Sequence, residues 1–329
     1  MSPPGPGVIF HVMRGEEILP GVIRLEVSSP LGELPPSVSY LLMGQGTVLC
    51  IDPGYPLPEV EKALKQAIPR GKEVIVLLTH GHVDHYGAAG FLQREYGAQV
   101  FVHRRDLAKV VLGVVTELDR RREEVQRHWR LMGLGDEIEA LWKELEVFRR
   151  MYAGVMEAHP LPPTISFGGW HLRVIPTPGH TAGSCSFYVE ERGWIFSGDT
   201  LLPHGLETWL SGPAFGEEGA WIEDYREGLR RIAALKPRWV LPGHGEPFRD
   251  YKGRIEEIGQ RCKRHKDEIL KVLDGEALTA LEVAQRLDVE ARGFVRLLVT
   301  GQVFSLLGQM ESEGLVESSR NGAIHWRRT

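Results

Sequence analysis

The order of apolar and polar residues over the first hundred positions predicts short strands that alternate with helices. Strands are expected at residues 22–27, 37–43, 47–51, 74–78 and 99–103. Most are rich in aliphatic and β-branched residues, Pro and Gly punctuate the chain between them, and 74–78 is a continuous apolar run typical of a strand buried on both faces. Helices are expected at 58–68 and 82–96. This alternation is typical of a layered α/β domain.

The middle of the chain has a different pattern. Residues 104–159 repeat apolar side chains at helical spacing on both sides of a break at Gly133–Gly135, which predicts two or three inserted amphipathic helices. We expect these helices to pack on the domain, and we also consider them as a lid or wall of a pocket. Strands are expected again at 170–175, 184–190, 193–196 and 238–241.

The last seventy residues predict a separate small unit. Helices are expected at 261–273, 278–287 and 294–313. Strands at 314–318 and 323–326 then flank Asn321–Gly322, a two-residue turn that strongly favours a β-hairpin. Three helices closed by a hairpin outline a winged helix. We therefore expect a main domain over 1–255 and a winged-helix domain over 256–329.

Composition narrows the class of protein. The 329 residues are 42% hydrophobic and 25% charged, the balance of a globular protein, and the length suggests two units. The net charge of 39 − 44 = −5 excludes a nucleic-acid-binding polycation. We find no apolar run near the about 20 residues of a membrane span and no signal-peptide pattern. Three widely spaced cysteines argue against a disulfide framework, so we expect a cytoplasmic protein.

Thirteen histidines provide the candidate chemistry, and four metal-capable side chains lie within six residues of one another. The segment T-H-G-H-V-D-H at 79–85 directly follows the predicted buried strand and contains His80, His82, Asp84 and His85. His80 and His82 are two residues apart, so their side chains can point to one side. Imidazole and carboxylate groups are zinc ligands, which makes this segment a candidate metal site.

Three later residues extend the candidate site. His180, Asp199 and His244 each follow a predicted strand and each has a glycine beside it. Loops after strands commonly carry functional groups in α/β sheets, and glycine allows the backbone to approach closely. A single His or Asp of this kind is usually a turn residue, but the ordered set favours a shared site.

This set of residues closely resembles the signature of the metallo-β-lactamase superfamily, and the resemblance spans roughly residues 20–250. It implies an αββα sandwich in which His80, His82 and His180 bind one metal ion, Asp84, His85 and His244 bind a second, and Asp199 bridges them. It also implies that Asp52 orients a metal-binding histidine. We expect two zinc ions, although iron and manganese also suit these ligands.

The expected activity is hydrolysis. Two such ions would lower the pKa of a water molecule between them, and the resulting bridging hydroxide would attack the substrate without a Ser or Cys nucleophile. Asp84 is a candidate catalytic residue because its carboxylate could orient or relay the proton.

The substrate class is open between two alternatives. The winged helix resembles a branch of the family that includes bacterial hydrolases and an animal endoribonuclease specific for single strands. Residues 262–329 hold ten Lys and Arg and ten Asp and Glu, so the tail lacks the positive charge that phosphate contacts need. We therefore prefer a small ester, thioester or lactone over single-stranded nucleic acid. A DNA-binding regulator with a relic metal domain is disfavoured because the ligand set is complete, and a homodimer stays open.

Three further residues are candidates for contact with the substrate. His204 follows Asp199 by five positions, and Tyr86 and Trp209 lie near the predicted ligands in the sequence. Each also has an ordinary interpretation as a loop or core residue.

Overall fold

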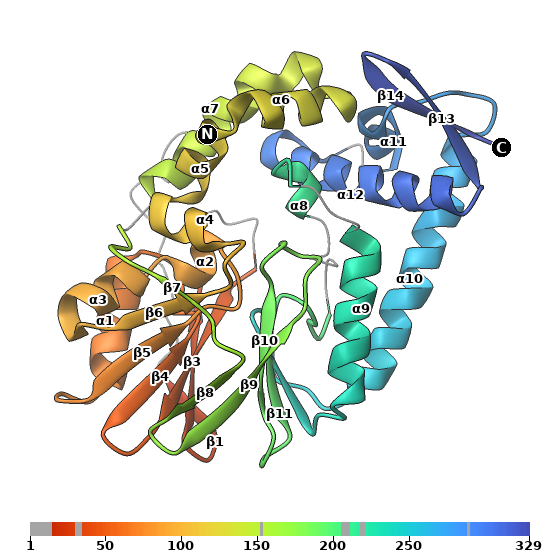
Figure 1. The fold of residues 1–329 in the computed structure, drawn as a ribbon. Coiled ribbons are helices and arrows are strands. Elements are labelled where there is room, and N and C mark those ends of the chain that lie inside the picture. Colours follow the sequence, from red (N-terminus) through yellow and green to blue (C-terminus); the bar gives the residue numbers. More distant parts are fainter. Residues whose placement is uncertain (1–14, 30–34, 152–153, 205–210, 218–220, 288–289) are drawn as a thin grey trace.

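Two β-sheets face each other between outer layers of helices in the computed structural model (Figure 1). The structure describes residues 15–29, 35–151, 154–204, 211–217, 221–287 and 290–329. This arrangement confirms the predicted α/β sandwich, and the candidate ligands lie in loops at one end of it.

The first sheet has seven strands in sequence order. They are β1 (Glu16–Leu19), β2 (Val22–Val27), β3 (Ser37–Met43), β4 (Thr47–Ile51), β5 (Glu73–Leu77), β6 (Gln99–Val102) and β7 (His159–Pro160). Neighbours from β1 to β4 pair antiparallel, whereas β4 to β7 pair parallel. Parallel strands need crossover connections, and the helices between β4 and β7 supply them.

The second sheet has five strands in the order β12-β11-β10-β9-β8. They are β8 (Thr164–Phe167), β9 (Trp170–Pro176), β10 (Cys185–Val189), β11 (Trp194–Gly198) and β12 (Trp239–Pro242). Strands β11 and β12 are parallel, so both end at the same edge of the sheet. That edge carries Asp199 and His244.

Successive side chains of a strand point to opposite faces of its sheet, and apolar side chains cover both faces. In β4, Leu49 and Ile51 point into the cluster between the sheets, and Val48 and Cys50 into the cluster under the outer helices. Leu241 and Val240 of β12 divide in the same way. Because both faces of these strands are buried, they read as continuous apolar runs in the sequence.

Helices cover the outer face of the first sheet. They are α1 (Pro58–Ala67), α2 (Val83–Tyr86), α3 (Ala89–Tyr96) and α4 (Leu107–Leu112). The helix predicted over 82–96 is two helices, because the chain breaks between Tyr86 and Ala89 where Gly87 packs against Pro56. A side chain at Gly87 would lie 2.3 Å from the Pro56 ring, so only glycine fits there.

Of the remaining helices, α9 (Trp221–Ala234) and α10 (Tyr251–Val272) lie along the second sheet, and the others lie above the end of the sandwich that carries the candidate site (Figure 1). The others are α5 (Val114–Arg120), α6 (Arg122–Leu131), η1 (Gly135–Glu137), α7 (Ile138–Arg150), α8 (Ser211–Ala214), α11 (Ala280–Leu287) and α12 (Gly293–Ser312). A single apolar cluster joins the predicted insertion, α9 and the C-terminal helices. The insertion therefore packs on the C-terminal helices as well as on the main domain.

The C-terminal elements follow the predicted order and end in the hairpin of β13 (Val316–Asn321) and β14 (Ala323–Arg328). Helix α10 begins ten residues before the predicted start at 261, because the Asp250 carboxylate accepts a 2.9 Å hydrogen bond from the Gly253 amide and caps the helix. The predicted boundary after residue 255 thus lies inside one continuous helix. No helix in the described ranges is long and apolar enough to cross a membrane.

Candidate metal centre

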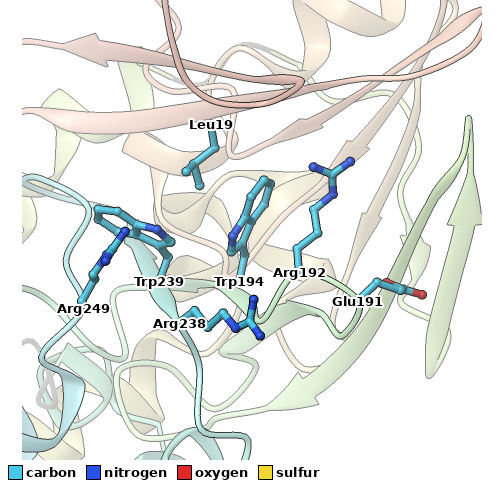
Figure 2. Close-up of a pocket in the computed structure, with 7 residues that line it drawn as sticks. All are labelled: Leu19, Glu191, Arg192, Trp194, Arg238, Trp239 and Arg249. Atoms are coloured by element: carbon cyan, nitrogen blue, oxygen red, sulfur yellow. The ribbon is translucent and has the colours of Figure 1, made fainter.

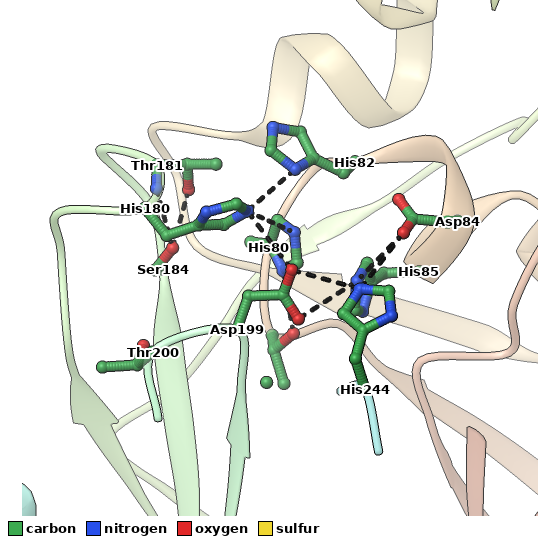
Figure 3. Close-up of polar contacts among 12 residues, drawn as sticks. His80, His82, Asp84, His85, His180, Thr181, Ser184, Asp199, Thr200 and His244 are labelled. Carbon is green, nitrogen blue, oxygen red and sulfur yellow. Dashed lines mark hydrogen bonds and ion pairs between the residues drawn. The ribbon is translucent and has the colours of Figure 1, made fainter. Parts of the chain in front are cut away.

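Seven side chains from five loop and helix positions converge at one end of the sandwich (Figure 3). Three groups have ligand atoms within 4.8 Å of one another: His80, His82 and His180; His80, His85 and Asp199; and Asp84, His85 and His244. The first four residues of the predicted signature come from the turn after β5 and from α2, and the other three follow β9, β11 and β12. The structure therefore brings together all seven predicted ligands.

The first group is a cluster of three imidazoles. Nε2 of His180 lies 3.2 Å from Nε2 of His80 and 2.9 Å from Nδ1 of His82. Burial lowers the pKa of His82 to about 3, with His180 adding to the effect, and burial with the neighbouring histidines also lowers the pKa of His80. These two rings are therefore neutral at pH 7 and can offer lone pairs to a cation.

We call His80, His82 and His180 the first group, and Asp84, His85 and His244 the second group. The two imidazoles of the second group also lie against the Asp199 carboxylate. Nε2 of His85 lies 3.4 Å from Oδ1 of Asp199 and 3.5 Å from Oδ2 of Asp84. Nε2 of His244 lies 3.3 Å from Oδ2 of Asp199 and 3.4 Å from Oδ2 of Asp84. His180 reaches the same Asp199 oxygen at 3.5 Å, so this carboxylate lies between the two groups (Figure 3).

The outer nitrogens of three rings are held by other partners, which leaves their inner nitrogens directed at the centre. Nδ1 of His80 is 3.0 Å from the Thr79 hydroxyl, Nδ1 of His85 is 2.9 Å from Asp52 Oδ2, and Nδ1 of His244 is 2.7 Å from the Pro36 carbonyl oxygen. Nε2 of His85 is buried and forms no hydrogen bond within the described part of the chain. An inner nitrogen fixed in this way fits a metal ion.

Electrostatics also favour a cation. Burial acts to raise the pKa of Asp199, but His244 and His85 outweigh it and hold that pKa well below its usual range. The pKa of Asp84 is lowered in the same way by His85 and His244. Burial acts to lower the pKa of His244, yet Asp199 and Asp84 raise it to about 10. In the absence of a metal ion, protons on the histidines balance these buried carboxylates.

Glycine beside the ligands allows the backbone to approach. A side chain at Gly243 would lie 2.4 Å from Asp199 Oδ1 and 2.8 Å from His85 Cε1. It would therefore fill the space between these ligands, which is the close approach that the sequence predicted for this position.

A buried ionic network beside the first ligand group was not found by the sequence analysis. Lys109 of α4 is 4% exposed, lies 3.0 Å from Asp106 Oδ1 and contacts Glu217. Oδ2 of Asp106 accepts hydrogen bonds from the Gly81 amide at 3.0 Å and the Thr181 hydroxyl at 2.6 Å. The network thus ties together the loops that carry His80, His82 and His180. A lysine in the apolar run 107–115 was the one sequence signal for it.

Aromatic side chains form a wall beside the first group, which the sequence analysis also missed. The Phe215 ring lies 5.8 Å from His82 and 6.1 Å from Phe294, and Phe294 lies 4.9 Å from Phe148 of α7. Phe294 belongs to α12, and its amide donates a 2.7 Å hydrogen bond to Glu144 of α7. The C-terminal helices therefore contribute to the surroundings of the centre.

The three candidate substrate contacts have different positions. Tyr86 is 1% exposed within the apolar cluster under the outer helices, so the structure does not bring it to an open face. His204 is exposed and lies beside Gly245, the residue after His244. Trp209 lies outside the described residues.

Comparison with known proteins gives a consistent result. The sequence model of the Metallo-beta-lactamase superfamily matches residues 32–154 and 160–244. The chain is 24% identical over 324 residues to a beta-lactamase-like protein 2 homolog of Caenorhabditis elegans, and the alignment covers 97% of this chain and 93% of the relative. It is 25% identical over 317 residues to the probable metallo-hydrolase YqjP of Bacillus subtilis, covering 92% and 95% of the two chains.

A solved structure extends the similarity to three dimensions. The metallo-beta-lactamase family protein TTHA1429 from Thermus thermophilus superimposes with a TM-score of 0.72 at 26% identity. The alignment covers 95% of this chain and all of the other. The similarity therefore includes the C-terminal helices, beyond the matched catalytic region.

Proposed function

This chain belongs to the metallo-beta-lactamase superfamily of metal-dependent hydrolases, and on this premise we propose that it uses two metal ions to hydrolyse a small ester, thioester or lactone. The position of Asp199 between the two ligand groups is the observation that carries the proposal. Its two oxygens lie 3.3–3.5 Å from the inner nitrogens of His85, His180 and His244. A carboxylate shared in this way suits a bridging ligand.

The ligands divide into two sets in this proposal. His80, His82 and His180 would hold one ion, Asp84, His85 and His244 would hold the other, and Asp199 would serve both. When bound, such ions activate a water molecule at neutral pH and stabilise the negative charge that develops on the substrate. Zinc suits these nitrogen and oxygen ligands, as do iron and manganese.

The protein's own residues position the centre and move the proton. Asp52 holds the His85 ring through Nδ1, and Pro36 holds His244 in the same way. We propose that Asp84 also carries the proton of the attacking water, because its side chain is 16% exposed whereas that of His85 is fully buried. A carboxylate at the rim can exchange a proton with solvent after each turnover.

The surroundings favour a small substrate with an apolar group. Phe215, Phe294 and Phe148 make the side of the first ligand group apolar, which suits a substrate with an acyl chain or ring. In the C-terminal hairpin, Arg327 forms a 2.6 Å ion pair with Glu317, so its positive charge is already balanced within the protein. We propose that residues 256–329 form a winged-helix unit that completes this apolar side, and that it does not bind nucleic acid.

A substrate panel tests the proposal. The chain is freed of metal with a chelator, reloaded separately with zinc, iron or manganese, and assayed on nitrophenyl esters, acyl thioesters, lactones, nitrocefin and labelled single-stranded RNA. We expect chelator-sensitive turnover of an ester, thioester or lactone, with two ions per chain. Hydrolysis of RNA alone would replace the proposed substrate class, and full activity with one ion would contradict the two-ion centre.

A further inference from the structure

We infer that the opposite end of the sandwich holds a second binding site, for a nucleotide, separate from the metal centre. A hollow of about 580 Å³ opens there, lined by Leu19, Glu191, Arg192, Trp194, Arg238, Trp239 and Arg249 (Figure 2). Such a volume is within the usual range for small-ligand sites, about 300–1,000 Å³.

Strand pairing fixes the location of this hollow. Trp194 and Trp239 are the first residues of β11 and β12 and lie opposite each other in the parallel pair. Asp199 and His244 follow the other ends of the same two strands. Five strand residues span roughly 16 Å, because each advances the chain by about 3.3 Å. A ligand in the hollow therefore does not share the metal centre.

The walls of the hollow can hold a flat ring. Trp194 is 7% exposed and belongs to the cluster between the sheets, and Trp239 packs against that cluster from the rim. The two indoles stand apart, with Leu19 from the first sheet above the gap between them (Figure 2). Burial fixes the Trp194 ring, which the Arg192 guanidinium covers, so the half-buried Trp239 ring is the indole on which a nucleobase can stack.

Three arginines give the hollow a positive charge. The Arg249 guanidinium lies 4.3 Å from the Trp239 ring centre, and that of Arg192 lies 4.9 Å from the Trp194 ring centre. Arg238 lies between these two arginines in Figure 2. Its backbone amide donates a 2.6 Å hydrogen bond to the Gly193 carbonyl. Within the described ranges, none of the three forms an ion pair.

The charge and the shape of the hollow together indicate which class of ligand it binds. Glu191 is the single acid among the lining residues, so the hollow carries a net charge of 3 − 1 = +2 on a chain whose net charge is −5. Guanidinium groups recognise phosphate through paired N–H donors, and the Trp239 indole recognises a planar ring. A phosphate joined to a heteroaromatic ring satisfies both features, which a bare anion or an uncharged ring does not.

Binding to the metal-free chain tests this inference. The full chain, treated with EDTA, is titrated with AMP while heat and tryptophan fluorescence are recorded, with adenosine, inorganic phosphate and an RNA dodecamer as separate arms. We expect saturable AMP binding that weakens with salt, and at least tenfold weaker binding of adenosine and of phosphate. Binding of the dodecamer without AMP binding would overturn the inference, as would AMP binding by the metal-loaded chain that the EDTA-treated chain lacks.

Paired variants locate the site. Arg238→Gln with Arg249→Gln should weaken AMP binding at least tenfold and leave esterase turnover unchanged. The control Arg230→Gln changes an arginine of α9 that is 69% exposed and paired with Glu227, and it should bind AMP as the parent does. Equal AMP affinity in the double variant and the parent would overturn the inference, because both altered arginines are exposed and their loss leaves the fold intact.

Discussion

Asp52 accepts a 2.9 Å hydrogen bond from Nδ1 of His85, across 33 residues of sequence. The same carboxylate accepts from the Thr79 amide at 2.8 Å and from the Thr79 hydroxyl at 2.6 Å. Asp52 itself has φ of 52°, in the left-handed region that few residues other than glycine adopt. Backbone strain of this kind commonly accompanies functional positions, and here it places a carboxylate behind a ring of the candidate metal centre.

Asp52→Asn should weaken metal binding by about 10- to 100-fold without unfolding the protein. Asparagine tolerates the left-handed conformation as aspartate does, so the backbone is retained. Either orientation of its amide, however, directs an NH₂ group at a donor from His85 or Thr79. Metal affinity by competition with a chromophoric chelator measures the effect.

Asp250→Asn is the matched control for this prediction. Asp250 caps α10 through the Gly253 amide, and asparagine caps a helix equally well. Its metal affinity should equal that of the parent. Parent-like affinity in the Asp52 variant as well would show that His85 does not depend on that carboxylate.

Asp199→Ala should reduce the metal content from two ions per chain to one or fewer and lower turnover by at least about 100-fold, equivalent to about 2.7 kcal/mol. The physical reason is the loss of the single carboxylate that faces both ligand groups. Metal analysis by mass spectrometry and circular dichroism together separate loss of the centre from loss of the fold. An active variant that holds two ions would refute the bridging role.

Lys109→Met should destabilise the fold by about 3–5 kcal/mol, because it leaves Asp106 and Glu217 buried without a cation. Denaturant unfolding measures the free energy. Adding Glu217→Gln should recover part of the lost stability. Burial raises the pKa of Glu217 and so disfavours its charged form, and glutamine carries no charge. Lys65→Met, at an exposed pair with Glu95, is the control and should change stability by less than about 1 kcal/mol. If the effects of Lys109→Met and Glu217→Gln on the free energy of unfolding were simply additive, the two side chains would not be coupled in a buried network.

Metal binding should release protons, and metal affinity should fall as the pH falls. In the metal-free chain Asp199 and Asp84 raise the pKa of His244 to about 10 despite its burial, so this ring is protonated at pH 8. A metal ion must displace that proton before it can bind Nε2. Zinc titration by calorimetry in two buffers of different ionisation enthalpy should give at least one proton released per chain. Heats that do not depend on the buffer would contradict the assignment of His244 as a ligand.

The main elements and the candidate ligands could be predicted because both depend on local patterns. Strand β5 is a continuous apolar run, and the four ligands from His80 to His85 follow it within six residues. His180, Asp199 and His244 could be added because each follows a strand, and the strands of such sheets end at a common edge. The boundaries were less accurate, as with α10, whose start depends on the cap at Asp250 and not on apolar spacing.

The residues around the ligands could not be placed from the sequence. Lys109 interrupts an apolar run, but its buried partner Glu217 lies 108 positions away and could not be identified from that pattern. Tyr86 is adjacent to a ligand in the sequence but points into the core, because the short helix α2 turns it away from the loops. The two tryptophans of the far hollow likewise line one site only because β11 and β12 pair in register.

The sequence by itself determined the alternation of strands and helices and the seven candidate ligands, since short-range spacing and strand ends encode both, and the resemblance to a family signature implied the sandwich and the two-ion centre. Tertiary structure alone decided which ring nitrogen of each histidine faces the centre, which charges lie buried next to it, and which aromatic residues of the C-terminal helices stand beside it. These features depend on contacts between segments far apart in the chain, and packing sets such contacts where periodicity carries no information.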